Sequence, residues 1–148
     1  MYDDDYSTCA RTYATLLIYP VRTDPETISE RLAILPSKWQ RKGGPMASNL
    51  GRPPRIAEID GWFLTTQGRI ESRDSRRHID GLLDQIEGKA AELRSLQEEG
   101  CRMSVSCYWL AANCGGGPTI SPEQMRRLGA LNIELWFDIY YLGEEGPG

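Results

Sequence analysis

Histidine is almost absent from this sequence of 148 residues, in which His78 is the only one. The four cysteines show no Cys-x-x-Cys spacing, whereas zinc sites usually draw on closely spaced pairs of cysteine or histidine. We therefore expect no metal site and no cofactor, and we expect four reduced thiols, some of them packed as small apolar groups. The four positions are Cys9, Cys101, Cys107 and Cys114.

Familiar catalytic motifs are also missing. The sequence contains no Gly-x-Ser-x-Gly, His-Glu-x-x-His or Gly-x-Gly-x-x-Gly pattern, and the lysine-serine pair of a phosphate-binding P-loop is absent. We therefore name no catalytic residue. The absence of these motifs favours a protein without catalytic activity and leaves the alternative of an enzyme open.

Long apolar runs and a basic charge balance are lacking as well. No stretch approaches the roughly 20 apolar residues of a membrane-spanning helix. The start of the chain is acidic and has no apolar run, so we expect no secretory signal and a cytoplasmic protein. The net charge of −4 argues against general affinity for nucleic acid.

The chain does contain the ordinary ingredients of a globular protein. Hydrophobic residues make up 40 % and charged residues 26 %, and the length suits one domain. We expect a mobile acidic tail at residues 1–11, a single domain at 12–142 and a loose tail at 143–148. Residues 36–55 are rich in proline, glycine and basic side chains, so we expect an irregular basic loop there.

Apolar spacing and helix-capping residues predict the regular elements. Strands are expected at 12–19, 56–66, 102–110 and 133–142, with Gly61 as a candidate bulge. Helices are expected from Asp24 to Pro36 with Ile28, Leu32 and Leu35 on one stripe, over 75–99 with a break at Gly88, and from Ser121, whose hydroxyl forms a capping box with Gln124. A further short strand is allowed for after the first helix or near residues 68–72.

Strands with one apolar face and helices with one apolar stripe predict an α+β fold in two layers. The sheet would be mainly antiparallel, with the helices covering one face. A ferredoxin-like core with an added α-β unit is the topology that we expect.

The uncovered sheet face carries the main functional hypothesis. Pleat alternation would place aromatic rings and carboxylates there, a mixture typical of protein contact or ligand stacking. A face covered by the 36–55 loop or by the N-terminal tail is the alternative. The interaction candidates are Trp62, Tyr108, Trp136, Asp138 and Tyr140, and Leu64, Tyr13, Leu17 and Tyr19 are expected on the same face.

Two further arrangements would give this sequence other chemistry. Asp60 and Asp138 could share a proton if their strands were neighbours, although solvated carboxylates are the plainer interpretation. The basic loop could bind an anion, or it could be a solvated loop that pairs with the acidic termini. The anion-binding candidates are Trp39, Arg41, Lys42 and Arg55.

Several short motifs occur in order along the chain: Asp24-Pro25-Glu26, Pro36-Ser37-Lys38-Trp39 with Lys42-Gly43, Gly61-Trp62-Phe63-Leu64, Ser121-Pro122-Glu123 and Phe137-Asp138-Ile139-Tyr140. Together they resemble a bacterial family of domains of unknown function, the family numbered 4279. The resemblance spans nearly all of residues 12–142. It implies a single cytoplasmic domain and names no catalytic residue.

The combined pattern favours a small non-catalytic interaction module that uses an aromatic sheet face. Its partner would be another protein or a second copy of the chain, and an immunity-type protein that masks a toxin is one concrete version. The alternative is a binding protein or enzyme for a small anionic ligand at residues 38–55.

Overall fold

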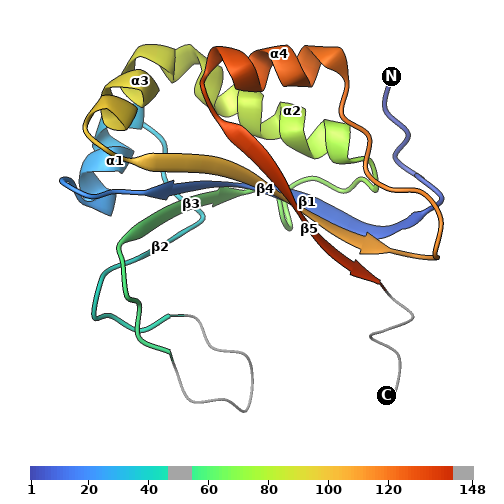
Figure 1. The fold of residues 1–148 in the computed structure, drawn as a ribbon, viewed down its shortest axis with the longest axis horizontal. Coiled ribbons are helices and arrows are strands. Elements are labelled where there is room, and N and C mark those ends of the chain that lie inside the picture. The colour runs from blue at the N-terminus through green and yellow to red at the C-terminus, as the bar shows by residue number, and fades with distance from the viewer. Residues whose placement is uncertain (47–54, 142–148) are drawn as a thin grey trace.

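The computed structural model describes residues 1–46 and 55–141. Helices lie on one side of a sheet, and the sheet's other side carries none in this part of the chain (Figure 1). The elements in chain order are β1 (Cys9–Tyr19), α1 (Pro25–Leu32), β2 (Lys38–Gln40), β3 (Gly61–Thr65), α2 (Ser75–Ile86), the 3-10 turn η1 (Glu87–Lys89), α3 (Ala90–Glu98), β4 (Arg102–Ala111), α4 (Pro122–Ala130) and β5 (Glu134–Tyr141).

The sheet has five strands in the order β2-β3-β1-β4-β5. Neighbouring strands are antiparallel, except that β4 and β5 are parallel. Parallel neighbours need a crossover connection, and α4 supplies it. The expectation of an α+β protein with a mainly antiparallel sheet and helices on one face is confirmed.

Helix α1 begins and ends where local chemistry requires. The Asp24 carboxylate accepts a hydrogen bond from the Thr27 amide at 2.8 Å, and Pro25 occupies the first turn, where no amide is needed. Ala33 adopts a left-handed conformation with φ of 53° and ends the helix. Leu35 therefore lies beyond the helix and is 83 % exposed, so its expected place on the apolar stripe is wrong.

The long helical segment is divided into α2 and α3, and Gly88 lies in the 3-10 turn between them, as expected. The expected stripe is buried against the sheet, with Ala90 partly buried. In α4 the Ser121 side chain caps the Gln124 amide and the Gln124 side chain caps the Ser121 amide. The buried stripe consists of Ile79, Leu82, Leu83, Ile86, Leu93 and Leu96.

Residues 36–55 are more regular than expected. Lys38–Gln40 form the edge strand β2, which is the short strand allowed for after the first helix, and Pro45 pairs with Ile56 in an isolated bridge. Residues 47–54 lie outside the described part of the chain. The strand expected from residue 56 begins only at Gly61.

The N-terminal segment, for which a mobile tail is expected at 1–11, makes several contacts with the helical layer. The Tyr2 hydroxyl donates to Asp80 of α2, and the Asp3 amide donates to Oδ2 of Asp74 at 2.7 Å. The Tyr6 ring packs edge-on against Trp109, with ring centroids 5.4 Å apart. The loose tail expected at 143–148 lies outside the described residues.

Two arginines form ion pairs with acidic residues of this N-terminal segment. Arg77 binds Asp4 at 2.7 Å and Arg73 binds Asp5 at 3.3 Å. These pairs explain why an acidic stretch can remain against the protein surface. No helix in the described part of the chain is long and apolar enough to cross a membrane.

Candidate functional site

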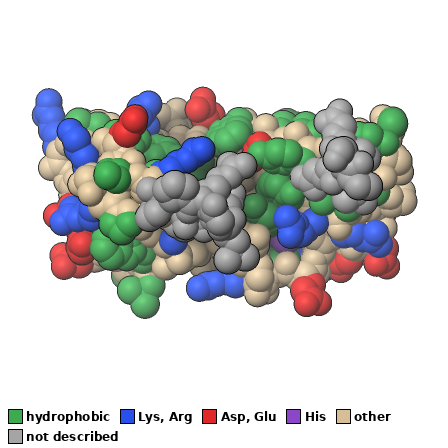
Figure 2. Space-filling model, turned by 90° about the horizontal axis from the view of Figure 1, so that it is seen from below, with side chains coloured by type: hydrophobic (Ala, Val, Ile, Leu, Met, Phe, Trp, Pro, Cys, Tyr) green, Lys and Arg blue, Asp and Glu red, His purple; other side chains and the backbone are tan. Residues whose placement is uncertain are grey.

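The sheet face without helices is hollowed. A cavity of about 910 Å³ opens over strands β2, β3, β1 and β4 and reaches β5. Figure 2 shows this face, with hydrophobic side chains visible in its middle and charged side chains mostly around its margin. Met46, Arg55, Ile56, Glu58 and Ile59 form a wall on the side of the β2–β3 connection.

Strand register arranges the floor of this hollow in rows that run across the sheet. Paired residues on neighbouring strands point to the same face, so the register fixes which side chains meet. One row is Tyr13, Tyr108 and Asp138; the next is Thr65, Thr15, Ser106 and Trp136; the third is Lys38, Phe63, Leu17, Ser104 and Glu134.

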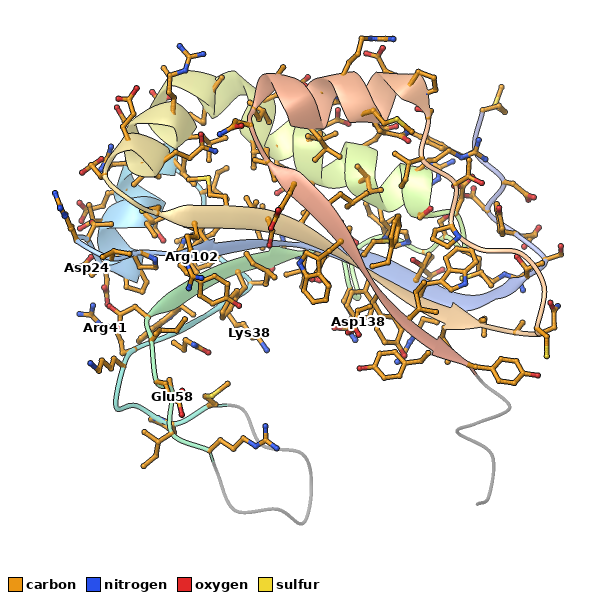
Figure 3. The ribbon with its side chains drawn as sticks, viewed as in Figure 1. Asp24, Lys38, Arg41, Glu58, Arg102 and Asp138 are labelled. Carbon is orange, nitrogen blue, oxygen red and sulfur yellow. The ribbon has the colours of Figure 1, made fainter. Side chains whose placement is uncertain are left out.

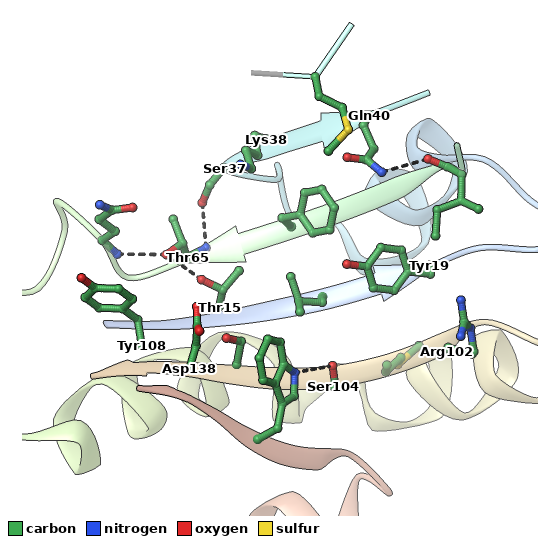
Figure 4. Close-up of a pocket in the computed structure, with 18 of the residues that line it drawn as sticks. Thr15, Tyr19, Ser37, Lys38, Gln40, Thr65, Arg102, Ser104, Tyr108 and Asp138 are labelled. Atoms are coloured by element: carbon green, nitrogen blue, oxygen red, sulfur yellow. Dashed lines mark hydrogen bonds between the residues drawn. The ribbon is translucent and has the colours of Figure 1, made fainter. Parts of the chain in front are cut away.

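The middle of the floor is a band of hydroxyl groups (Figure 4). The Thr15 hydroxyl donates to Oγ1 of Thr65 at 3.0 Å, and the Thr65 amide donates to Oγ of Ser37 at 2.9 Å. The Trp136 indole N–H donates to Oγ of Ser104 at 3.2 Å. Hydroxyl groups retain donor and acceptor capacity beyond these bonds, so the floor is suited to polar groups of a bound partner.

An aromatic cluster lies at the end of the hollow where Tyr108 is found. The rings of Tyr13 and Tyr108 stack with centroids 4.6 Å apart, and Tyr140 lies 5.4 Å from Tyr108. Burial raises the pKa of Tyr13, and the neighbouring Tyr108 adds to the shift. Tyr13 therefore stays protonated at neutral pH and offers a neutral ring and hydroxyl.

Charges of both signs line the hollow. Lys38, Glu58, Arg102 and Asp138 all lie on the side of the sheet away from the helices (Figure 3). The Arg102 guanidinium lies over the Tyr19 ring at 5.8 Å. The basic lining residues are Lys38, Arg55 and Arg102, and the acidic ones are Glu58, Glu134 and Asp138.

Trp62 is a correction, because it lies on the helix side of the sheet and is fully buried. It pairs with Ile18, a core residue, and its indole N–H donates to Oγ of Ser29 in α1 at 2.9 Å. Because the indole N–H has a hydrogen-bond partner, this large ring can be buried without leaving a polar group unpaired. Leu64 is 1 % exposed in the same core, so its expected place on the open face is also wrong.

The other interaction candidates do lie on the open face. Tyr108, Trp136 and Asp138 line the hollow, and Tyr140 is 43 % exposed beside Tyr108. Tyr13, Leu17 and Tyr19 of β1 line it as well.

The lining residues that sequence reasoning did not name as candidates include Phe63, Lys38 and Arg102. Arg102 shares the alternation of Ser104 and Tyr108, so this signal was present in the sequence. Lys38 was assigned to the irregular loop, and its side chain faces Phe63 only because β2 pairs with β3.

The anion-binding candidates do not form one site. Trp39 pairs with Trp62, so it belongs to the helix side of the edge strand, whereas Arg55 lines the hollow. The Arg41 guanidinium lies 3.6 Å from a carboxylate oxygen of Glu26 and 3.7 Å from one of Asp60, so it forms ion pairs with two carboxylates. Lys42 is exposed, and its backbone amide donates a hydrogen bond to Oδ1 of Asp60 at 2.6 Å.

Asp60 and Asp138 do not form an acid/base pair. Two strands, β1 and β4, separate β3 from β5, and Asp60 precedes β3 in the chain. Asp60 instead fixes the turn around Arg41, as described above.

A comparison with family models places this arrangement among known sequences. A model described as domain of unknown function (DUF4279) matches residues 10–142, which is most of the chain. The chain belongs to this family. A search of curated proteins found no match to this DUF4279 chain, and a search of solved structures found none either.

The reactive side chains of this DUF4279 domain outside the hollow are mostly shielded. Burial raises the pKa of Cys9 and of Cys107 to about 11, so both thiols stay protonated. His78 is buried, with Nδ1 2.6 Å from the Thr66 hydroxyl and Nε2 2.8 Å from the Ser72 carbonyl oxygen. Across residues 1–46 and 55–141, no three histidine, cysteine, aspartate or glutamate side chains are grouped as metal ligands.

Proposed function

We propose that this DUF4279 domain is a protein-binding module whose open sheet face receives an extended segment of a partner protein. The observation that carries the proposal is the 910 Å³ hollow, which combines aromatic rings, hydroxyl groups and both signs of charge on one face. Aromatic residues and arginine are enriched where proteins bind one another. A protein that masks a toxin is one concrete version, motivated by the chain's small size and net charge of −4.

The balance of charge favours a polypeptide over a simple anion. Three basic side chains line the hollow, and three carboxylates line it too. A polypeptide segment can present groups of both signs to such a surface, whereas an anion would be repelled by Glu58, Glu134 and Asp138. A small anionic ligand is therefore the second candidate, supported by Lys38, Arg55 and Arg102.

Selection from a random peptide-display library tests the first candidate. Wild-type protein should enrich peptides, and their dissociation constants should then be measured against two serine-to-arginine variants. Ser106→Arg places a large side chain on the floor of the hollow, whereas Ser95→Arg makes the same change on the exposed side of α3. We expect the first variant to weaken binding at least about tenfold and the second to leave it unchanged.

Failure has a clear form in this design. Enrichment of no peptide, or equal binding by both variants, would contradict the proposal. The anionic alternative is tested by thermal shift with phosphorylated and carboxylated metabolites. A true ligand at about 100 times its dissociation constant should stabilise the protein by about 2.7 kcal/mol, and Arg102→Gln should reduce that gain.

A finer description of the fold accompanies the functional proposal. We propose that β1 to β4 with α1 to α3 form a ferredoxin-like unit, to which α4 and β5 add an α-β unit. In support, β3 lies between β1 and β2, and β1 lies between β3 and β4, with every one of these neighbours antiparallel.

A further inference from the structure

Strand β5 forms one edge of the sheet and exposes large apolar side chains on both of its faces. On the helix side, Phe137 is 40 % and Ile139 is 58 % exposed, although their neighbours on β4 are buried. On the open side, Trp136 and Tyr140 are each 43 % exposed. The helical layer therefore does not cover this edge.

The two edges of the sheet differ in protection. An edge strand offers unpaired backbone groups to other chains, and proteins commonly block such edges with lysine, proline, a bulge or a very short strand. Edge strand β2 has three residues, begins at Lys38 and follows Pro36 by two positions. Edge strand β5 has eight residues, contains neither lysine nor proline, and pairs with β4 without a register shift.

The sequence of β5 is compatible with antiparallel pairing to its own copy in a particular register. Two-fold symmetry through Phe137 places that ring opposite its copy and Leu135 opposite Ile139, all on the helix side. On the open side it places Trp136 opposite Asp138 and Glu134 opposite Tyr140. Every carboxylate in this register faces an aromatic ring of the other copy.

Neighbouring registers are disfavoured by charge. Centring the symmetry on Asp138 would place this carboxylate against its own copy, and centring it on Trp136 would place Glu134 against Asp138. Like charges directly opposite on paired strands are destabilising. Centring on Ile139 avoids this conflict, but the overlap within Glu134–Tyr141 then shrinks.

We propose that two copies of this chain dimerise through β5, antiparallel and centred on Phe137, so that the two five-stranded sheets become one continuous sheet. The occupant of the edge is a second copy because, in this register, apolar side chains of the strand meet apolar side chains of its copy and no carboxylate lies directly opposite another. This proposal concerns the outer edge of β5. Trp136 and Asp138 of this strand also line the hollow, so the peptide site is tested separately, at Ser106 on β4.

Sedimentation velocity over a concentration series tests the association itself. We expect the wild-type mass to rise toward twice that of the monomer as concentration increases. Ile139→Lys should weaken association at least about tenfold, because it adds like charges to both copies at the edge. Leu35→Lys changes an exposed apolar residue far from β5 and should leave the dissociation constant unchanged.

Cysteine cross-linking tests the register without relying on a disruptive variant. In a Cys114→Ser background, which removes the exposed native thiol, Phe137→Cys should form a disulfide-linked dimer under mild oxidation. Ile139→Cys should remain largely unlinked, because its two copies lie four residues apart along the strands, or roughly 13 Å. The double change Leu135→Cys and Ile139→Cys should restore the link.

Two results would overturn the proposal. A wild-type protein that stays monomeric up to about 1 mM would exclude a dimer of useful affinity. Linking at residue 139 alone in preference to residue 137 would show that the strands pair in another register. Either result would leave the peptide-binding proposal to its own experiment.

Discussion

The rings of Tyr13 on β1 and Tyr108 on β4 lie 4.6 Å apart between centroids, with their planes 9° from parallel. The two residues are also paired in the β1–β4 register, so backbone pairing holds the rings in contact. Arg11 places its guanidinium 5.3 Å from the centre of the Tyr108 ring and extends the group. This stack fixes one end of the candidate binding surface.

A double-mutant cycle should detect the stack as a coupling energy. Tyr13→Leu and Tyr108→Leu should each lower the free energy of unfolding, and their combined loss should be smaller than the sum by about 0.5–1.5 kcal/mol. Urea denaturation of the four proteins measures this quantity. Additive losses would show that the rings contribute area alone and that the stack does not organise the surface.

Alternation along the chain was enough to place most of the open face. Strands β1, β4 and β5 have eight or more residues each, so their period of two is visible in the sequence. Strand β3 has only five residues, and four of them are buried. Both Trp62 and Phe63 are aromatic, so alternation could not decide which of them faces the helices.

Contacts between distant parts of the chain determine which of these two rings faces the helices. Ser29 on α1 accepts the indole N–H of Trp62, and Ile18 pairs with it across the sheet. The docked N-terminal segment has the same origin, since its partners Asp74 and Asp80 are some 70 residues away or more. Strand order and such long-range partners are not encoded in local pattern. This is why the sequence placed Trp62 on the wrong face and did not predict the contacts of the N-terminal segment.

Gly61 is required because the Phe63 ring lies against it. A Cβ atom at Gly61 would fall 2.4 Å from Cζ of Phe63, so Gly61→Ala should displace that ring toward the hollow. Over-packing of this kind should lower the free energy of unfolding by about 1–3 kcal/mol, measured by urea denaturation. Gly88→Ala is the matched control, since nothing lies within 4 Å of its added Cβ.

The two glycine variants distinguish an effect of side-chain packing in the folded protein from an effect of backbone freedom in the unfolded chain. Gly88→Ala should be neutral or stabilising by up to about 1 kcal/mol, because alanine restricts the unfolded chain. Equal stability of Gly61→Ala and wild type would contradict the packing account. The bulge expected at Gly61 is wrong, because β2 and β3 pair there without a register shift.

His78 should make the protein less stable in mild acid. Burial lowers the pKa of His78 below its usual 6.5, although the Ser72 carbonyl opposes the shift. The unfolded chain therefore binds a proton more readily than the folded chain, so the free energy of unfolding should fall as pH drops below about 6.5. Because His78 is the only histidine, its ring resonance in an NMR titration reports the folded pKa without assignment ambiguity.

A substitution provides the second readout for this histidine. His78→Gln cannot titrate, so the stability of this variant should change less between about pH 7 and about pH 5 than that of the wild type. A folded pKa at or above 6.5, or an unchanged slope in the variant, would contradict the role given to burial.

Asp74 should be the more costly of two aspartates that cap helices. Asp74 is fully buried, and its carboxylate accepts hydrogen bonds from the Arg76 guanidinium at 2.7 Å and from the Arg76 amide at the start of α2. It also accepts a hydrogen bond from the Asp3 amide. The Asp24 carboxylate, by contrast, caps the Thr27 amide of α1. Asp74→Ala should therefore lower the free energy of unfolding by about 3 kcal/mol or more, since it removes a cap and leaves Arg76 without its partner. Asp24→Ala should cost clearly less in the same urea denaturation. Hydrogen exchange should also show faster exchange of the Asp3 amide in Asp74→Ala and not in Asp24→Ala. Equal losses of stability in the two variants would contradict the role of Asp74 in holding the N-terminal segment.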